Sequence, residues 1–381
     1  MAVDGNAVGA LSPLPASGAL RLAPVGFEAL LGFGEDDHLA AFRCFAGSAR
    51  ALAAGQAEVR PARKPSPALL AAARAALQAR VADRTEARRF FEAWFRPWRV
   101  IAEPQGEGFL TGYYEPIVAA SRRQTAAYGW PILGRPDDLV TFAPEAAPSD
   151  FPPGVSAARR RDDGRLEPYP EREAIEKERR GPIVWLRDAA EAFLVQVQGS
   201  AQARLPGGAR ARLVYDGRNG LPYASIGRIL IESGEIAEGD MSLERLKAWL
   251  RAAGLGEGER GLKLMRRNRS FVFFRLVEDF DPALGPIGGE GVALTPMRSI
   301  AVDRAVWSYG LPFFIEADLP WAGGKKAPLR RLMIAQDTGS AIVGSARADI
   351  FFGSGDAAGR VAGSIRHRAV FTVLLPLGDE F

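Results

Sequence analysis

Residues 335–359 read AQDTGSAIVGSARADIFFGSGDAAG, and this stretch decides how the C-terminal part of the chain folds. Runs of glycine, alanine and serine separate two short segments, each of which places one aspartate, Asp337 or Asp349, beside apolar residues. Asp349 is followed directly by the apolar run 350–352. Burying a carboxylate among apolar residues costs free energy unless the carboxylate has polar partners. Either these aspartates cap turns in a β-rich core, or one of them is tuned for proton transfer.

The spacing of the aspartates favours a shared cleft. About a dozen residues separate Asp337 from Asp349, which is enough for a strand, a turn and a returning strand. Asp303, in SIAVDRAVW, interrupts another apolar segment. A carboxylate that is desolvated and lies near a second acid has a raised pKa, so it can act as a general acid near neutral pH. For Asp337, capping of the turn at Thr338 and Gly339 is an equally weighted structural alternative.

Composition restricts the function classes. The chain has 381 residues, of which 47% are hydrophobic and 25% charged, so two domains of a folded protein are expected. The net charge is +4, and no run of lysine or arginine is interleaved with aromatic residues, so nucleic acid is not an expected partner. A mildly basic protein can favour an acidic polymer, such as a cell-wall glycan that carries peptide carboxylates.

The residue types give little support for a metal site or for a catalytic serine or cysteine nucleophile. Cys44 is the only cysteine, and His38 and His367 are the only histidines. No H-E-x-x-H, G-x-S-x-G or phosphate-loop motif is present. We therefore expect no metal and no cofactor, and we assign acid–base chemistry to carboxylates or tyrosines. The sequence contains no recognisable signal peptide or lipobox cysteine, and no apolar run of the ~20 residues that span a bilayer.

The order of patterns predicts a mainly β protein with a helical N-terminus. Residues 1–26 form an extended lead-in, and helices are expected over 35–55, 66–81 and 83–100, the last broken by Pro97. One further helix is expected at 242–254. Short segments rich in β-branched and aromatic residues predict strands, and these are 108–121, 192–205, 211–225, 270–280, 298–307 and 311–319.

Two of the expected strands carry polar groups suited to sugars. Alternation puts Tyr113 and Tyr114 on opposite faces, so one can be core and the other can line a cleft. Gln196 and Gln198 would share a face, and their amides suit hydroxyl and N-acetyl groups. The alternatives are strand packing for the tyrosines and an outward polar face for the glutamines.

A set of motifs in a fixed order carries a family resemblance. The segments LTGYYEP, QVQGS, YDGRNGLPYASIGRILIESGE, NRSFVFF, GVALTPMRSIAVDRAVWSYGLPFFIE, AQDTGSAI and RADIFFGSGDAAGRVAG closely resemble the membrane-bound lytic murein transglycosylase A family over roughly residues 105–365. The three aspartates for which the C-terminal region of that family is named correspond to Asp303, Asp337 and Asp349. Ser340, Val343 and Ala201 depart from residues frequent in the family.

The resemblance implies a double-psi β-barrel domain that carries an inserted second β-barrel domain, with a groove between them. The first domain would comprise 27–116 and 266–381, including the N-terminal helices, and the insert would comprise 117–265.

The resemblance further implies cleavage of the β-1,4 bond between N-acetylmuramic acid and N-acetylglucosamine, leaving 1,6-anhydromuramyl ends. Asp349 would be the single catalytic acid and base, supported by Asp337 and Asp303. The substrate-binding residues expected are Thr111, Tyr113, Tyr114, Gln198, Ser200, Asn219, Tyr223, Ser225, Thr338 and Gly339. Peptidoglycan glycan strands would be the substrate and other cell-wall enzymes candidate partners of a monomer in the periplasm or cell envelope.

Two other functions stay open at this point. One is a glycan-binding module without catalysis, which the presence of Asp349 disfavours. The other is a hydrolytic glycosidase that uses Asp349 together with Asp337, which would need the two carboxylates ~5 Å or ~6.5–9.5 Å apart.

Overall fold

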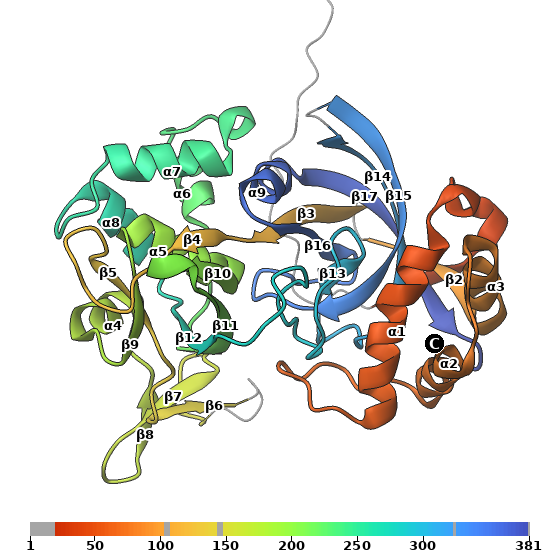
Figure 1. Cartoon of the computed structure of the whole chain (residues 1–381), viewed down its shortest axis with the longest axis horizontal. Helices are drawn as coiled ribbons and strands as arrows, with labels where there is room; N and C mark the ends of the chain where they lie inside the picture. Colours follow the sequence, from red (N-terminus) through yellow and green to blue (C-terminus); the bar gives the residue numbers. More distant parts are fainter. Residues whose placement is uncertain (1–19, 103–106, 143–147, 323–324, 380–381) are drawn as a thin grey trace, which may run out of the picture.

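The computed structural model describes residues 20–102, 107–142, 148–322 and 325–379, and Figure 1 shows two lobes joined through a pair of consecutive strands. The helical N-terminus and the C-terminal strands form one lobe, and the middle of the chain forms the other. Among the described residues, no helix is long and apolar enough to cross a membrane.

The expected N-terminal helices form, and their caps explain where they begin. Helices α1 (His38–Ala54), α2 (Pro67–Gln78) and α3 (Arg84–Trp94) start after Asp37, Ser66 and Asp83. Each of these three side chains accepts a hydrogen bond from a backbone N–H of the first turn, which satisfies a donor that the helix leaves free.

The third helix is shorter than expected. Residues 95–100 form strand β2 (Phe95–Val100), which contains Pro97 and pairs with the C-terminal strand. Proline cannot donate to the ladder, but the Pro97 carbonyl still accepts from the backbone N–H of Val25. The expected helix over 83–100 is therefore wrong beyond residue 94.

A closed barrel of six strands forms the first lobe. Its order is β17–β14–β15–β13–β16–β3, and pairing of β3 with β17 closes it. Two of its strand pairs, β13/β15 and β16/β3, are parallel, and the other four are antiparallel. The strands are β3 (Gly108–Glu115), β13 (Ser299–Val302), β14 (Pro312–Ala322), β15 (Lys325–Asp337), β16 (Arg347–Ser354) and β17 (Arg366–Pro376). Strands β1 (Leu22–Pro24) and β2 extend the sheet beside β17. The expected double-psi barrel with N-terminal helices is confirmed.

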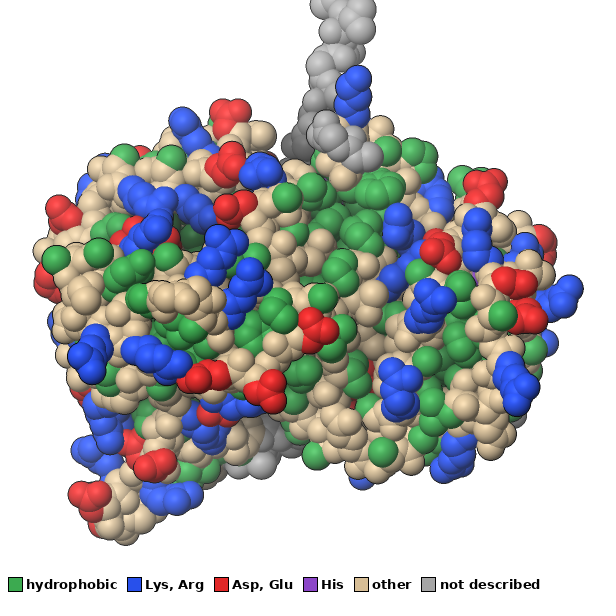
Figure 2. Space-filling model, in the orientation of Figure 1, with side chains coloured by type: hydrophobic (Ala, Val, Ile, Leu, Met, Phe, Trp, Pro, Cys, Tyr) green, Lys and Arg blue, Asp and Glu red, His purple; other side chains and the backbone are tan. Residues whose placement is uncertain are grey.

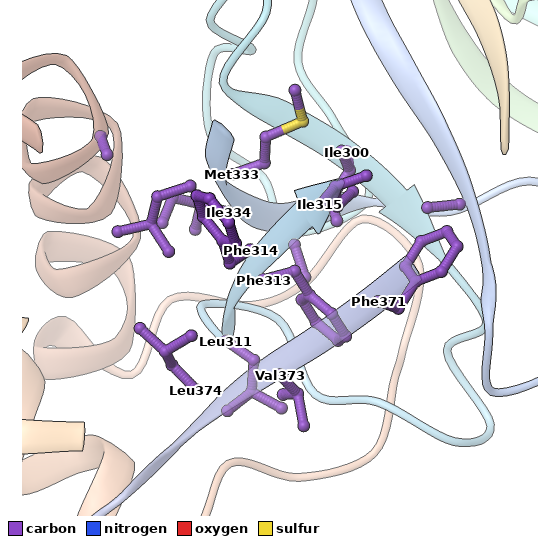
Figure 3. Close-up of a cluster of buried hydrophobic side chains, with 14 of the residues drawn as sticks. Ile300, Leu311, Phe313, Phe314, Ile315, Met333, Ile334, Phe371, Val373 and Leu374 are labelled. Atoms are coloured by element: carbon purple, nitrogen blue, oxygen red, sulfur yellow. The ribbon is translucent and has the colours of Figure 1, made fainter. Parts of the chain in front are cut away.

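Apolar side chains fill this barrel and its contact with the N-terminal helices (Figure 3). Phe313, Ile315, Ile334 and Val373 are at most 1% exposed. Helix α9 (Asp356–Gly363), between β16 and β17, packs on β3, where Gly359 faces the Tyr114 ring so closely that any larger side chain would clash.

The insert forms a second, smaller barrel. Strands β4 (Ile117–Ala119), β10 (Ser200–Arg204), β11 (Arg210–Arg218) and β12 (Val272–Val277) make one sheet, and β5 (Trp130–Leu133) pairs with β9 (Pro182–Leu186). Bridges between Gly134 and Phe274 and between Ser121 and Trp185 join the two sheets into a ring. Because β12 pairs with β11, the chain returns to the first barrel after Val277, later than the expected residue 265.

Outside this ring, the insert carries a hairpin extension and more helix than the sequence predicts. The extension consists of β6 (Leu139–Thr141), β7 (Ala157–Arg160) and β8 (Leu166–Pro168). The helices are α4 (Arg172–Glu178), α5 (Ala189–Gln198), α6 (Ile226–Glu232), α7 (Leu243–Ala252) and α8 (Arg260–Arg266). The helix expected at 242–254 is α7, and Ser242 caps it.

The expected strand over 192–205 is wrong in its first half, because residues up to Gln198 belong to α5 and only Ser200–Arg204 are extended. A short apolar run fits a buried helix as well as a strand, and here the side chain of Asp188 caps the helix by accepting from the N–H of Glu191. Since residues two apart point in different directions on a helix, Gln196 and Gln198 do not share a face.

A buried ionic cluster fixes the junction of the two barrels. Glu115, the last residue of β3, is fully buried and pairs with Arg212 of β11 at 2.8 Å. Gln202 and Ser354 also donate to Glu115 Oε2, at 2.9 and 2.7 Å. One carboxylate therefore joins β3, β10, β11 and β16.

Candidate active site

Strand register brings Asp349 and Asp337 to the same region of the barrel. Asp349 lies opposite Ala301 on one side and Thr111 on the other, and Ala301 lies opposite Asp337. The four residues thus form one row across β15, β13, β16 and β3. Two strand spacings separate the aspartate backbones, which is about 10 Å.

Asp349 accepts a hydrogen bond from a hydroxyl group whose direction of donation is fixed. The Thr111 hydroxyl donates to Asp349 Oδ1 at 2.5 Å, and Arg347 Nη2 donates to Thr111 Oγ1 at 2.7 Å. A guanidinium can only donate, so the threonine accepts from Arg347 and gives its proton to the carboxylate. The other oxygen, Asp349 Oδ2, has no hydrogen bond within the described part of the chain.

The surroundings raise the pKa of Asp349 above its ordinary value. Burial is the main cause, and the charge of Asp337 acts in the same direction; the Arg347 charge and the Thr111 hydrogen bond oppose it. The side chain is half-buried. Asp349 is thus a carboxyl group that holds its proton more strongly than usual and has one oxygen free.

Asp337, in contrast, uses both carboxylate oxygens. Tyr113 donates its hydroxyl to Oδ2 at 2.8 Å, and the backbone N–H of Gly289 donates to Oδ1 at 2.8 Å. Burial, with the charge and hydrogen bond of Asp337, raises the pKa of Tyr113 well above its usual value, so Tyr113 remains a donor. The two tyrosines divide as alternation predicts: Tyr113 lies in the site, and Tyr114 is 4% exposed beneath α9.

Asp303 stabilises a turn. Its oxygens accept from the backbone N–H groups of Ala305 and Gly344, at 2.9 and 2.7 Å, so this carboxylate is paired with the backbone on both sides of the turn. The hydroxyl of the buried Thr338 donates to the Val302 carbonyl at 2.8 Å, which ties the end of β15 to the end of β13. Gly339, directly after Thr338, begins the turn that leads towards β16.

The residues expected from the insert lie in different environments. Gln198 accepts from the backbone N–H of Tyr114 at 3.2 Å, so it lies against β3. Ser200 is 8% exposed at the start of β10, and Asn219 is fully buried, with its amide bonded to four backbone groups, including the N–H of Phe271. The geometry of Asn219 favours a structural role within the insert.

Tyr223 and Ser225 lie in the loop before α6. Ser225 caps that helix by accepting from the N–H of Arg228, and burial raises the pKa of Tyr223, which also feels the charge of Arg366 on β17. This loop is therefore within electrostatic reach of the first barrel.

The sequence prediction missed Gly289 and Arg60, and it did not place Arg347 beside Asp349. Arg347 is two residues before Asp349 on the same strand, so alternation could have placed both on one face. The other two lie in loops without periodicity. Gly289 reaches Asp337, and Arg60 Nη1 donates to the Thr338 carbonyl at 2.7 Å.

Within the described residues, no group of three histidine, cysteine, aspartate or glutamate side chains could hold a metal ion. In Figure 2, acidic and basic side chains are interspersed over both lobes, so this face has no continuous basic patch of the kind that nucleic acids bind. The carboxyl group of Asp349, with a raised pKa and one free oxygen, is suited to proton transfer.

Comparison with known proteins points to one family. Residues 109–275 match the family model of the MltA specific insert domain, and residues 298–375 match that of the 3D domain. Among solved structures, the membrane-bound lytic murein transglycosylase from Agrobacterium tumefaciens is similar, with 34% identity and a TM-score of 0.82, covering 93% of this chain and 97% of that one. MltA from Neisseria gonorrhoeae has 27% identity and a TM-score of 0.73, covering 99% and 98% of the two chains.

A curated relative gives the same result at lower coverage. Membrane-bound lytic murein transglycosylase A of Escherichia coli strain K12 is 30% identical over 270 residues, which cover 70% of this chain and 65% of the relative. The chain thus spans just under two thirds of the length of that relative. The residues that the two family models match belong to both barrels and include the row that carries Asp349 and Asp337.

Proposed function

Because this chain belongs to the membrane-bound lytic murein transglycosylase A family, we propose that it cleaves the β-1,4 bond between N-acetylmuramic acid and N-acetylglucosamine in peptidoglycan and leaves 1,6-anhydromuramyl ends. The observation that carries the proposal is Asp349: a half-buried carboxyl group with a raised pKa and one free oxygen. A group of this kind can give up a proton and take one back in the same catalytic cycle.

In the first step, protonated Asp349 donates its proton to the glycosidic oxygen, and the C1–O bond of the muramyl residue breaks. The leaving group departs as the 4-hydroxyl of N-acetylglucosamine. In the second step, the ionised Asp349 takes the proton of the muramyl C6 hydroxyl while that oxygen bonds to C1. The carboxyl group is then protonated again, and no water is consumed.

The hydrogen bonds support a single-carboxylate mechanism. The bond from Thr111 leaves Oδ2 of Asp349 as the oxygen that carries the transferred proton. Asp337 is poorly placed as a nucleophile, because Tyr113 and Gly289 occupy both of its oxygens. We therefore assign Asp337 to tuning of the pKa of Asp349, and Asp303 to support of the turn at Gly344.

The remaining assignments follow the same premise. The residues that would contact the glycan are Thr111, Tyr113, Gln198, Ser200, Tyr223, Ser225, Thr338 and Gly339. Tyr114 and Asn219 are buried, so they would support the segments that make these contacts. The proposed domains are the first barrel with its helices, and the insert from residue 117 to the end of β12. The proposed location is the cell envelope, and the protein would act as a monomer, alone or with other cell-wall enzymes.

Mass analysis of digested murein tests this function. The wild-type protein is expected to release muropeptides that end in 1,6-anhydromuramic acid. Reducing ends would indicate a hydrolytic glycosidase instead, and binding without any product would indicate a glycan-binding module. Either of these results overturns the proposal.

A further inference from the structure

The loop between α1 and α2 connects the N-terminal helices to the end of β15. In Figure 1 this loop extends from the helices toward the insert. The backbone N–H of Arg60 donates to the Gly289 carbonyl, and the Arg60 carbonyl accepts from the Tyr309 hydroxyl, both at 3.0 Å. The Nη1 atom of the Arg60 side chain donates to the Thr338 carbonyl at 2.7 Å. Arg60 is therefore fixed beside the strand end that carries Asp337.

The Arg60 side chain reaches across to the insert. Its guanidinium lies 4.0 Å from the ring centroid of Tyr215 on β11, and a Cβ on Gly199 would lie 3.8 Å from its Nη2. Arg60 thus lies between the first barrel and the strand that also carries Arg218.

Two more guanidinium groups share this region. Arg218 is half-buried, and its Nε is buried without a hydrogen-bond partner in the described structure. Burial lowers the pKa of Arg218, and the charges of Arg60 and Arg304 lower it further; Tyr215 opposes them, and no described carboxylate does. Arg304 is exposed and donates to the carbonyl of Pro61 at 2.9 Å.

These arginines are incompletely paired. Each of Arg60, Arg218 and Arg304 donates one side-chain hydrogen bond to a backbone carbonyl, and none forms an ion pair with a carboxylate in the described parts of the chain. Glu58, two residues before Arg60, accepts the N–H of Ala62 through Oε2 at 2.7 Å and forms no ion pair with these arginines in the described residues. Like charges held together and partly desolvated destabilise the protein unless an anion joins them.

We propose that Arg60, Arg218 and Arg304 form a subsite for a carboxylate of the stem peptide that muramic acid carries. The proposal rests on the proposed function, which brings a muramyl residue to Asp349. The planar guanidinium fork matches a carboxylate and forms paired, charge-assisted hydrogen bonds with it. The sugar hydroxyls and N-acetyl amides are uncharged and give no reason for three cations that lack a carboxylate partner among the described residues. Arg60 connects this subsite to the carbonyl of Thr338, next to Asp337.

Three forms of the same glycan strands test the subsite: strands with intact stem peptides, strands whose stem carboxylates are amidated, and strands from which the stems have been removed. The last form retains the lactyl carboxylate on the sugar, so it separates that source of charge from the stem. Arg218→Gln is expected to raise KM for intact strands roughly tenfold, with kcat unchanged, and to leave KM for the other two forms as in the wild type. Added salt should weaken binding of the intact strands most.

The matched control is Arg165→Gln, which removes the same charge at the tip of the β7–β8 hairpin and should change no KM. Arg304→Gln provides a variant at an exposed position if Arg218→Gln does not fold, and it should show the same selective rise. Equal KM values of the wild type for intact and amidated strands would overturn the subsite. So would a rise in KM for all three strands, which would indicate loss of general glycan contact.

The two proposals fail separately. If the wild type forms anhydro ends but does not discriminate between stem forms, the function stands and the subsite does not. If it forms no anhydro ends, binding of intact against amidated strands, measured directly, still decides the subsite.

Discussion

Strand β3 contacts two carboxylates, Asp349 of β16 at its middle and its own Glu115 at its end, and they differ in how fully the charge is paired. At the middle of the strand, Thr111 donates one hydroxyl hydrogen bond to Asp349. At its end, Glu115 is fully buried and receives hydrogen bonds or ionic contacts from Arg212, Gln202 and Ser354.

The difference indicates which acid is structural and which is available for chemistry. A buried carboxylate with complete pairing joins elements and is strongly destabilising only when a partner is lost. A desolvated carboxyl group with an unoccupied oxygen holds its proton and can transfer it. We therefore expect substitutions at the two sites to separate activity from stability.

The largest effect on activity is expected from Asp349→Asn. The amide keeps the shape but cannot transfer a proton, so release of anhydro muropeptides should fall by roughly a hundred- to ten-thousand-fold, while glycan binding is largely retained. The measurement is the rate of product release with a parallel binding assay. Activity near that of the wild type would remove Asp349 from the mechanism.

The same variant should not lose stability. The folded state raises the pKa of Asp349, so the wild type loses part of its free energy of unfolding as pH rises from the unfolded value, about 3.9, through the raised folded value. Asparagine does not ionise, so the variant does not lose this part of the free energy of unfolding as pH rises. Thermal melts at neutral pH should place Asp349→Asn at or above the wild type, and the difference should disappear in acid.

Glu115→Gln, in contrast to Asp349→Asn, is expected to lower the stability of the protein. The change leaves Arg212 charged and buried at the junction, and the free energy of unfolding should fall by about 3–5 kcal/mol. Chemical denaturation measures this effect. Glu278→Gln is the control, because it removes an exposed ion pair with Arg122 and should change stability by less than about 1 kcal/mol. Similar losses from both variants would contradict the comparison.

The sequence predicts the features that depend on residues close together in the chain better than those that depend on distant residues. The opposite orientations of Tyr113 and Tyr114 follow from local alternation, and the caps of the N-terminal helices follow from Asp37, Ser66 and Asp83. These features depend on residues that are close together in the chain, so a pattern can reveal them.

The features that the sequence did not predict depend on distant partners. The row that joins Asp337, Ala301 and Asp349 requires the strand register, and β12 belongs to the insert because it pairs with β11. A short apolar run has no distinctive period, so the sequence predicts a strand over residues that form helix α5. Arg60 lies in a loop, and only the tertiary structure brings it to Thr338.

A smaller effect on activity is expected from Thr111→Val, which removes the hydroxyl bonded to Asp349 and the acceptor for Arg347. The rate should fall about tenfold, the equivalent of one hydrogen bond to a charged group. Because that bond lowers the pKa of Asp349, its loss should raise the pKa. The high-pH limb of the pH–rate profile, which reports loss of the proton from the general acid, should then move to higher pH. A limb that moves to lower pH would show that Thr111 acts otherwise.

The smallest effect on rate, but an opposite shift, is expected from Asp337→Asn. The negative charge of Asp337 helps to raise the pKa of Asp349, so a neutral amide should lower that pKa and move the high-pH limb to lower pH. Activity below that limb should be reduced only moderately, because the proposed mechanism forms no bond between Asp337 and the sugar, and anhydro ends should remain the only products. Asp303→Asn is the matched control: it should lower activity through the turn at Gly344 without moving the limb. Opposite shifts of the limb for Thr111→Val and Asp337→Asn would show that both residues control the pKa of Asp349. A covalent glycosyl adduct on Asp337 in the wild type would instead make Asp337 a nucleophile and contradict the role proposed for it.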